Sequence, residues 1–413
     1  MARERKRVIT ALDIGTTKVC AMIAEAGGGS LDIIGVGVSH NEGMKKGLVV
    51  DLEKVEQAVY RAVSDAERMS GTGVDKVYIG VSGSHIGSNS AHGMAIVQDQ
   101  RRGITEEDVT RCVESARVLL LPPDKEIVDI VVQEFLVDGH GGVCDPIGMA
   151  GSRLEARVQI ITGASSFLQN IIRCVLKLDI TVAGLLLEPL ASGEAVLSED
   201  EKQIGVVLLD IGGGTMDMAV FRDGSLCRAR ILPVGGNHID NDVAVGLSTS
   251  LREAERLKIE HGRAFLSGVD ESVPIDIQPI GQEKRVQRPK GLLCEIIQAR
   301  VMEMVRLVFR ELEESEATAI VPGGVVITGG GALLEGFAEI ASRLLDMHVR
   351  VGHPRYAGAH REMVTSPIFA TAVGMLQYAE RRVQSGWVEE MPRRGGLQRF
   401  VKNIAGISKV FLP

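Results

Sequence analysis

The chain has 413 residues, of which 45% are hydrophobic and 24% are charged, values typical of a globular protein too long for one ordinary core. Its formal net charge of −8 argues against a dedicated nucleic-acid surface, and its six cysteines form no C-x-x-C pair that would indicate zinc or a disulfide framework. The N-terminus lacks a signal-peptide core, and no stretch reaches the roughly 18 apolar residues of a spanning helix. We therefore expect a cytoplasmic protein of two or more domains.

The first predicted element is a hairpin over "VITALDIGTTKVCAMI" (residues 8–23). An apolar strand ends at Asp13, and the tip that follows contains Gly15, Thr16, Thr17 and Lys18. A glycine turn lets the backbone approach a phosphate closely, and the hydroxyls add donors. For a single copy, an ordinary turn between strands is the more common explanation.

Residues 84–162 predict a separate small α+β domain. "GMAIVQ" reads as a strand, "ITEEDVTRCVESARVLL" as a helix with Thr105 as its N-cap, and "EIVDIVVQEFLVDG" and "RLEARVQIIT" as two further strands.

The hairpin pattern returns in "LLDIGGGTMDMAV" (residues 208–220), where Asp210 precedes Gly212, Gly213, Gly214 and Thr215. A carboxylate beside a phosphate is tolerable only when a cation such as Mg²⁺ and its waters lie between them. Two copies predict two similarly built domains that offer their tips to opposite sides of one phosphate chain. The sequence contains neither a P-loop nor a glycine turn that opens a Rossmann helix.

Three later segments also place glycine or charge where a nucleotide could lie. "PVGGNHIDNDVA" (233–244) predicts a glycine loop that leads into a helix, and "REAERLKIEHG" (252–262) predicts a helix on which Glu255 and Lys258 share a face. An exposed ion pair is the ordinary explanation for those two charges. "GGVVITGGGALLEGF" (323–337) predicts a strand, a turn at residues 329–331 and a helical segment. A base or ribose could lie on that turn, or the turn could simply join strand to helix.

Five segments resemble, in chain order, the five motifs of the actin-like ATPase superfamily: the first hairpin, "EPLASGEAVL" (188–197), the second hairpin, "TGGGALLEG" and "SPIFATAVGML" (366–376). The resemblance implies an α/β fold of two related halves around a nucleotide cleft. It implies that Asp13 and Asp210 hold Mg²⁺ through water. Glu188, near the terminal phosphate, and Asp210 would be the catalytic residues. Glu255 and Lys258 would hold the adenosine. Helices beginning near Glu188 and Ser366 would form the hinge. The implied ATP-binding residues are Asp13, Gly15, Thr16, Thr17, Lys18, Asp210, Gly212, Gly213, Gly214, Thr215, Gly235, Gly236, Asn237, Glu255, Lys258, Gly329, Gly330 and Gly331.

"DPIGMAGSRLEARVQIITG" (145–163) closely resembles the FtsA family of bacterial cell-division proteins, in which a subdomain is inserted at this position. The implied division is a first half (1–83, 163–198 and 361–382), an inserted subdomain (84–162), a second half (199–235 and 310–360), an outer subdomain (236–309), a linker (383–396) and a terminal helix (397–413).

The FtsA resemblance implies an ATP-binding scaffold with weak or slow ATPase activity. Such a scaffold would form filaments and tether the FtsZ ring to the cytoplasmic membrane at the division site. It would also recruit later division proteins there. On the helix "LLCEIIQARVMEMVRLVFREL" (292–312), Arg300 and Glu303 match the place where the family contacts the C-terminal peptide of FtsZ; two solvated charges are the alternative. A small-metabolite kinase and a pilus-assembly relative remain alternative functions.

The tail "LQRFVKNIAGISKVFLP" predicts an amphipathic helix. Five basic residues and no acidic one lie from Arg393 onward, which leaves −13 for the rest of the chain. This basic end predicts binding to anionic membrane lipids, although a helix docked on the body is the alternative. No role is assigned to Trp387 in the preceding linker. The apolar face comprises Leu397, Phe400, Val401, Ile404, Ile407, Phe411 and Leu412, and the basic face comprises Arg399, Lys402 and Lys409.

Overall fold

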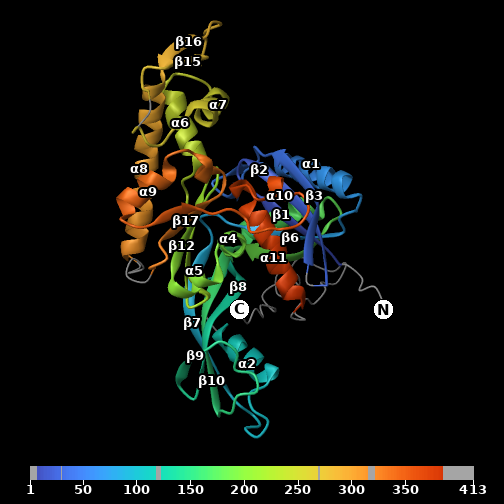
Figure 1. The fold of residues 1–413 in the computed structure, drawn as a ribbon. Coiled ribbons are helices and arrows are strands. Elements are labelled where there is room, and N and C mark those ends of the chain that lie inside the picture. The colour runs from blue at the N-terminus through green and yellow to red at the C-terminus, as the bar shows by residue number, and fades with distance from the viewer. Residues whose placement is uncertain (1–6, 29, 118–121, 268–269, 315–320, 385–413) are drawn as a thin grey trace.

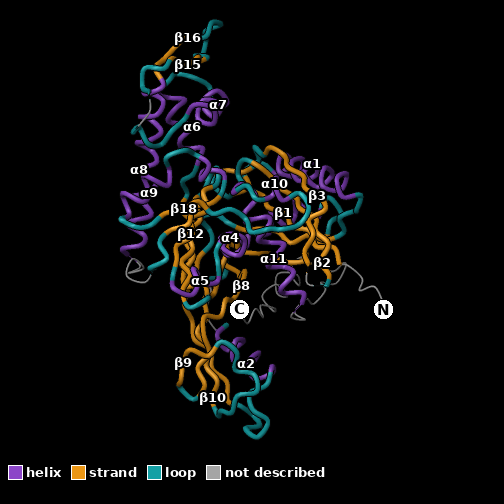
Figure 2. Tube along the Cα trace, in the orientation of Figure 1, coloured by secondary structure: helices purple, strands orange, loops and turns teal. Residues whose placement is uncertain are grey.

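The computed structural model describes residues 7–28, 30–117, 122–267, 270–314 and 321–384. The described chain is elongated: two sheets lie side by side in the middle, a mainly helical part lies at one end, and a small sheet with one helix lies at the other (Figure 1; Figure 2). Among the described residues, no helix is long and apolar enough to cross a membrane.

The first half is built on a five-stranded sheet with the order β11-β6-β1-β2-β3. β1, β2 and β3 form an antiparallel meander, whereas β6 and β11 are added in parallel. The hairpin expected around Asp13 is confirmed, because β1 and β2 pair along their whole length. The elements are β1 (Arg7–Ile14), β2 (Lys18–Gly27), β3 (Ser30–His40), the short pair β4 (Met44–Lys45) and β5 (Leu48–Val49), α1 (Leu52–Ser70), β6 (Lys76–Val81), α3 (Ser165–Leu176) and β11 (Thr181–Leu187).

The second half repeats this topology in a sheet with the order β14-β13-β12-β17-β18. β12, β13 and β14 form the meander, and β17 and β18 are added in parallel. The hairpin around Asp210 is likewise confirmed, and so is the expected fold of two related halves. The elements are α5 (Glu199–Ile204), β12 (Val206–Ile211), β13 (Met216–Arg222), β14 (Ser225–Leu232), β17 (Val325–Thr328), the 3₁₀ turn η2 (Gly330–Leu333), α9 (Phe337–Leu345) and β18 (Val349–Val351).

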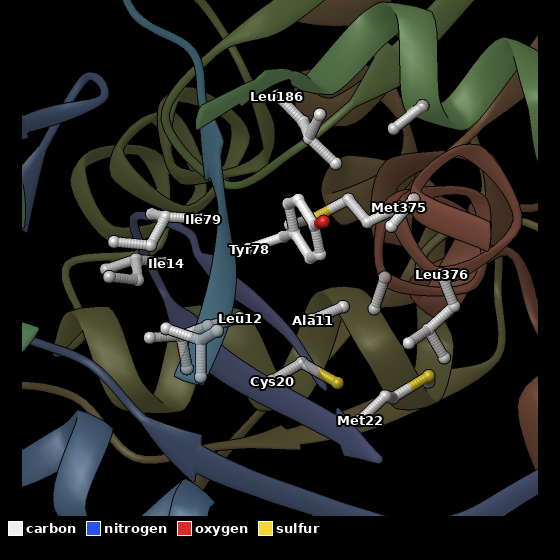
Figure 3. Packing of buried hydrophobic residues seen from close by; sticks show 14 of the residues in the cluster. Ala11, Leu12, Ile14, Cys20, Met22, Tyr78, Ile79, Leu186, Met375 and Leu376 are labelled. Atoms are coloured by element: carbon white, nitrogen blue, oxygen red, sulfur yellow. The ribbon is translucent and has the colours of Figure 1, made fainter. Parts of the chain in front are cut away.

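Two helices cross between the halves. α4 (Glu188–Val196) follows β11, and α11 (Ala370–Gln384) follows α10 (Arg361–Val364) and the 3₁₀ turn η3 (Pro367–Phe369). The crossing is very close, because a Cβ added at Gly374 of α11 would lie 1.7 Å from the Ala191 carbonyl oxygen of α4. Side chains of β1, β2, β6, β11 and α11 fill the core beneath this crossing (Figure 3).

The mainly helical end contains α6 (Gly236–Gly246), α7 (Leu251–His261), β15 (Pro274–Ile277), β16 (Val286–Pro289) and the long helix α8 (Lys290–Glu314). The structure therefore confirms two predictions: the glycine loop that leads into α6, and the helix that carries Glu255 and Lys258.

The small end contains β7 (Gly87–Ile96), α2 (Glu106–Ala116), β8 (Lys125–Val137), β9 (His140–Val143) and β10 (Arg153–Ala164), with the sheet order β7-β10-β8-β9. Thr105 caps α2 as expected, in a reciprocal capping box with Asp108. Two details differ from the sequence-based expectation. β7 begins six residues early, at Gly87 instead of Gly93, because pairing with β10 overrides the low strand propensity of Ser, Asn and Gly. The short strand β9 was not expected.

Candidate nucleotide site

The tips of the two hairpins have the same backbone turn and face each other. The Gly15 N–H donates to the Lys18 carbonyl at 2.9 Å, and the Gly212 N–H donates to the Thr215 carbonyl at the same distance. The Gly213–Gly214 tip lies directly against Thr16 and Thr17, since added Cβ atoms would overlap with both threonine side chains. The fold therefore brings together two segments that are almost two hundred residues apart in the sequence.

Four acidic side chains lie behind these tips. Asp13 and Asp210 are the next-to-last residues of β1 and β12, Glu188 opens α4, and Asp217 lies on β13. Burial raises the pKa of Glu188 well above its ordinary value, and the charges of Asp13, Asp217 and Asp210 raise it further. Burial also raises the pKa of each aspartate. The cluster thus carries more negative charge than its surroundings stabilise.

Lys18 is the basic residue that opposes this charge. Its ammonium lies 3.8 Å from Asp13 Oδ2, donates to the Ile368 carbonyl and lies 5.3 Å from the centre of the Phe369 ring. It lowers the pKa values of Asp13, Asp210 and Glu188, but burial outweighs it at each of them.

Hydroxyl groups hold two of the carboxylates in place. Ser192 of α4 and Thr371 of α11 donate to Asp210 Oδ2 at 2.5 and 3.1 Å, so both crossing helices are joined to this acid. Ser82, which follows β6, donates to Asp217 Oδ2 at 2.5 Å.

Four residues of this cluster were not predicted from the sequence: Asp217, Ser82, Ser192 and Thr371. A signal existed for Asp217, because it is a charged residue inside the otherwise apolar strand "MDMAVF", where a buried carboxylate needs a partner. The three hydroxyl residues gave no such signal, because only the tertiary fold aims them at the acids.

Next to the acidic cluster is a cavity of about 580 Å³ between the hairpin tips, α6, α7 and η2. It contains both polar groups and apolar side chains such as Ile239, Leu334 and Ile368, as expected for a site that takes a flat base. Arg263 and Lys290 also line it and were not singled out from the sequence. The cavity is lined by nine of the residues implied by the resemblance: Thr17, Gly212, Gly213, Gly236, Asn237, Glu255, Lys258, Gly330 and Gly331.

Two glycine segments next to the cavity pack closely on the second hairpin. The Gly235–Asn237 loop is fixed on the second hairpin, since the N–H groups of Gly236 and Asn237 donate to Gly212 and Gly213. Gly329 has a positive φ of 80° and lies so close to Asp210 that a Cβ would be 2.3 Å from Oδ1. Glycine is therefore required there for both reasons.

Lys258 does not form the ion pair with Glu255 that the helix spacing suggested. Its ammonium donates to Asp240 of α6 at 2.8 Å, and both Glu255 and Lys258 border the cavity. The i, i+3 spacing placed the two residues on one face, but a carboxylate on the neighbouring helix is the partner of the lysine.

Arg300 and Glu303 lie on α8, away from the cavity. The Arg300 guanidinium makes a two-point contact with Asp242 of α6, at 2.5 and 2.9 Å, and contacts Glu303 at 2.6 Å. Arg300 is thus held by carboxylates of its own chain and is not the simple solvated charge offered as the alternative. The residues assigned to the membrane helix, 397–413, and Trp387 lie outside the described residues.

Comparison with known proteins identifies the family. A family model described as cell division protein FtsA matches residues 207–374, and one described as the SHS2 domain inserted in FtsA matches residues 83–162. The cell division protein FtsA of Neisseria meningitidis is 37% identical over 412 residues, which cover 97% of this chain and 99% of the relative. The chain belongs to the FtsA family. The FtsA of Bacillus subtilis is 39% identical to this FtsA-family chain over 373 residues, which cover 90% of the chain and 83% of the relative.

Solved structures show the same actin-like fold at low identity. The PilM–PilN type IV pilus biogenesis complex matches with a TM-score of 0.64 at 16% identity, over 90% of this FtsA-family chain and 98% of the other. MreB5 of Spiroplasma citri bound to AMPPNP matches with a TM-score of 0.56 at 14% identity, over 92% and 98%. FtsA membership makes the chain a cell-division protein, in preference to the kinase and pilus-assembly alternatives.

The acidic cluster fits a divalent cation. Neighbouring carboxylates raise the pKa values of Asp13, Glu188 and Asp217, and Asp217 Oδ1 has no hydrogen-bond partner among the described atoms. In the described part of the chain, no group of three or more His, Cys, Asp or Glu side chains is arranged to hold a metal directly. Carboxylates such as Asp13 and Asp210 suit a hydrated Mg²⁺, which binds proteins through few carboxylates and keeps several waters.

Proposed function

We propose that this FtsA-family chain is an ATP-binding scaffold of cell division. It binds ATP with Mg²⁺ between its two hairpins, assembles into filaments, holds the FtsZ ring at the cytoplasmic face of the cell membrane and recruits later division proteins. One observation carries the proposal: in an FtsA-family chain, two equivalent glycine-containing tips meet beside a cavity that has room for a nucleotide.

The two hairpins provide the phosphate site. The tip residues Thr16, Thr17, Gly213 and Gly214 present backbone and hydroxyl donors, and the lack of Cβ atoms on the second tip permits close approach. Asp13 and Asp210 would hold the waters of Mg²⁺, whose charge offsets the carboxylate repulsion behind the tips.

The wider part of the cavity provides the nucleoside site. Glu255 and Lys258 border it on α7, and Gly330 and Gly331 border it from η2. We assign the adenosine to this space. The solved structure of MreB5 bound to AMPPNP shows that a protein of this fold binds an adenine nucleotide analogue.

Glu188 is the proposed residue nearest the terminal phosphate. Burial and the neighbouring carboxylates raise the pKa of Glu188, which makes its carboxylate a stronger proton acceptor, as a general base requires. We propose that hydrolysis is weak or slow, with nucleotide binding serving mainly to hold the two halves together.

The C-terminal tail is the proposed membrane anchor, and its sequence supports this role. A helix of about sixteen residues is only marginally stable alone in water, and Gly406 lowers its stability by about 1 kcal/mol relative to alanine. Contact with lipid would supply the ordering energy, through apolar burial and about 1 kcal/mol of attraction for each basic residue near an anionic surface.

Sedimentation with anionic vesicles tests the tether. The full-length chain should sediment with the vesicles, in part even at high salt, whereas a chain that ends before Leu397 should stay in solution. Phe400→Glu with Phe411→Glu should release the full-length chain without changing its affinity for ATP. Retention of the double variant on vesicles would refute the anchor.

A further inference from the structure

A second hollow, of about 680 Å³, lies on the loop that joins β18 to α10. Arg355, Arg361 and His353 line it together with Tyr356, and none of the described residues that line it is acidic. The hollow shares no residue with the nucleotide cavity. It is therefore a separate, positively charged surface.

The two arginines are available to a partner. Both side chains are exposed, and within the described residues neither guanidinium has a carboxylate at ion-pair distance. Two guanidinium groups on one hollow fit carboxylates well, because each can donate two parallel hydrogen bonds to one carboxylate.

Hydrogen bonds to three other elements fix the loop at Arg355 and Tyr356. The Arg355 N–H donates to the Ala195 carbonyl at 2.8 Å, and Gln377 of α11 donates to the Arg355 carbonyl at 2.9 Å. The Tyr356 hydroxyl accepts from the Ile33 N–H of β3 at 2.8 Å. The arginines therefore project from a fixed backbone.

The tail leaves the body close to this hollow. α11 ends at Gln384, seven residues after Gln377, which is about 10 Å along the helix and almost two full turns. Positions 377 and 384 thus lie on the same face of α11, the face in contact with the hollow. The next six residues, 385–390, can span up to about 20 Å and can reach back to it.

Those six residues are complementary to the hollow. Their sequence is "SGWVEE", and Glu389 and Glu390 are the only acidic residues after Glu380. Trp387 precedes them and offers an apolar, aromatic surface that can pack beside Tyr356.

We propose that residues 385–390 dock on the hollow, with Glu389 and Glu390 paired to Arg355 and Arg361 and with Trp387 packed beside Tyr356. Docking would shorten the free linker before Leu397 to residues 391–396, so the tail would be held near one face of the body. The proposal stands on the hollow and the linker and does not depend on lipid binding.

Fluorescence of the full-length chain tests this docking, because Trp387 is the only tryptophan. The wild type should emit at shorter wavelength than free tryptophan and resist quenching by acrylamide. Arg355→Glu with Arg361→Glu should shift the emission to longer wavelength and increase quenching. Arg306→Glu with Arg310→Glu makes the same charge change at exposed sites on α8 and should leave both readings unchanged.

A charge exchange makes the test specific. Adding Glu389→Arg and Glu390→Arg to the Arg355→Glu, Arg361→Glu variant should restore the wild-type emission. The proposal would be overturned if the wild type emitted at the wavelength of free tryptophan. It would also be overturned if the Arg355→Glu, Arg361→Glu variant had the same emission as the wild type. If the arginine variant keeps the wild-type emission but binds anionic vesicles less well, a lipid headgroup occupies the hollow and the docking is likewise refuted.

Discussion

Gly213 of the second hairpin lies against Thr17 of the first, so closely that an added Cβ would be 2.4 Å from Thr17 Cγ2. A matching contact joins Gly214 to Thr16, with 2.5 Å between the added Cβ and Thr16 Oγ1. When the turns are aligned on Asp13 and Asp210, Thr16 corresponds to Gly213 and Thr17 to Gly214. The two tips therefore meet through equivalent positions, as two related hairpins face each other across an approximate two-fold axis.

Gly213→Val should weaken ATP binding. The new side chain would collide with Thr17 and approach Asn237, so the tips would have to separate. An overpacking cost of about 1–3 kcal/mol corresponds to roughly 5- to 150-fold in affinity. Titration calorimetry measures the loss. Gly73→Val is the control, at an exposed position where the added Cβ would make only an ordinary contact with Glu67. Wild-type affinity in the Gly213 variant would show that the tips do not contact the phosphates.

Gly374→Ala should destabilise the fold where α4 and α11 cross. The added Cβ would strike the backbone of Ala191, which cannot move without shifting α4. We expect the free energy of unfolding to fall by about 1–3 kcal/mol or more, measured by denaturant titration. Gly73→Ala should have little effect. An unchanged denaturation midpoint for the Gly374 variant would mean that this crossing is looser than described.

Local sequence pattern predicted the elements of the site well. The apolar runs that end at Asp13 and Asp210 and the glycine turns after them specify two hairpins, because buried strands and tight turns depend on neighbouring residues. Thr105 likewise revealed the start of α2, since an N-cap is a local feature.

Contacts between distant residues were not predictable in this way. The partner of Lys258 is Asp240 on another helix, and the partners of Asp210 are hydroxyls on α4 and α11. Helical spacing determines which residues share a face but not which neighbouring element covers that face. The pair of Arg300 with Asp242 was not predicted for the same reason, since it joins α8 to α6.

The stability of the second half should depend on pH through Glu201. Partial burial raises the pKa of Glu201, but hydrogen bonds from Arg350 and Ser198 outweigh it and lower the pKa from 4.5 to about 2. A carboxyl with a lowered folded-state pKa stabilises the fold above its unfolded pKa, and this contribution is lost as the pH falls from about 4.5 towards 2.

Arg350→Met should therefore flatten this acid dependence. Because both side chains are partly exposed, we expect only about 1 kcal/mol less stability near neutral pH and a smaller difference near pH 3. Denaturant titrations at several pH values measure it. Arg222→Met removes an exposed arginine and serves as the control. Equal pH dependence in the Arg350 variant and the wild type would contradict the assignment.

Arg300→Glu should weaken binding of the FtsZ C-terminal peptide, if α8 carries that contact as proposed. Asp242→Asn is the informative companion, because it weakens the hold on Arg300 and should leave peptide affinity equal or higher. Fluorescence anisotropy with a labelled peptide measures both. Loss of affinity in both variants would mean that Arg300 only supports the structure, and no loss in either would place the peptide elsewhere.

The most direct test of the nucleotide site is calorimetric titration of ATP with Mg²⁺ into the wild type and Asp210→Ala. Asp210 is half-buried and desolvation raises its pKa, so the loss of its charge should not unfold the protein, which thermal denaturation can verify. Asp75→Ala, at an exposed position, is the control. We predict that the wild type and the control bind ATP and that folded Asp210→Ala shows no measurable binding; unchanged affinity in folded Asp210→Ala would contradict the assignment of this site.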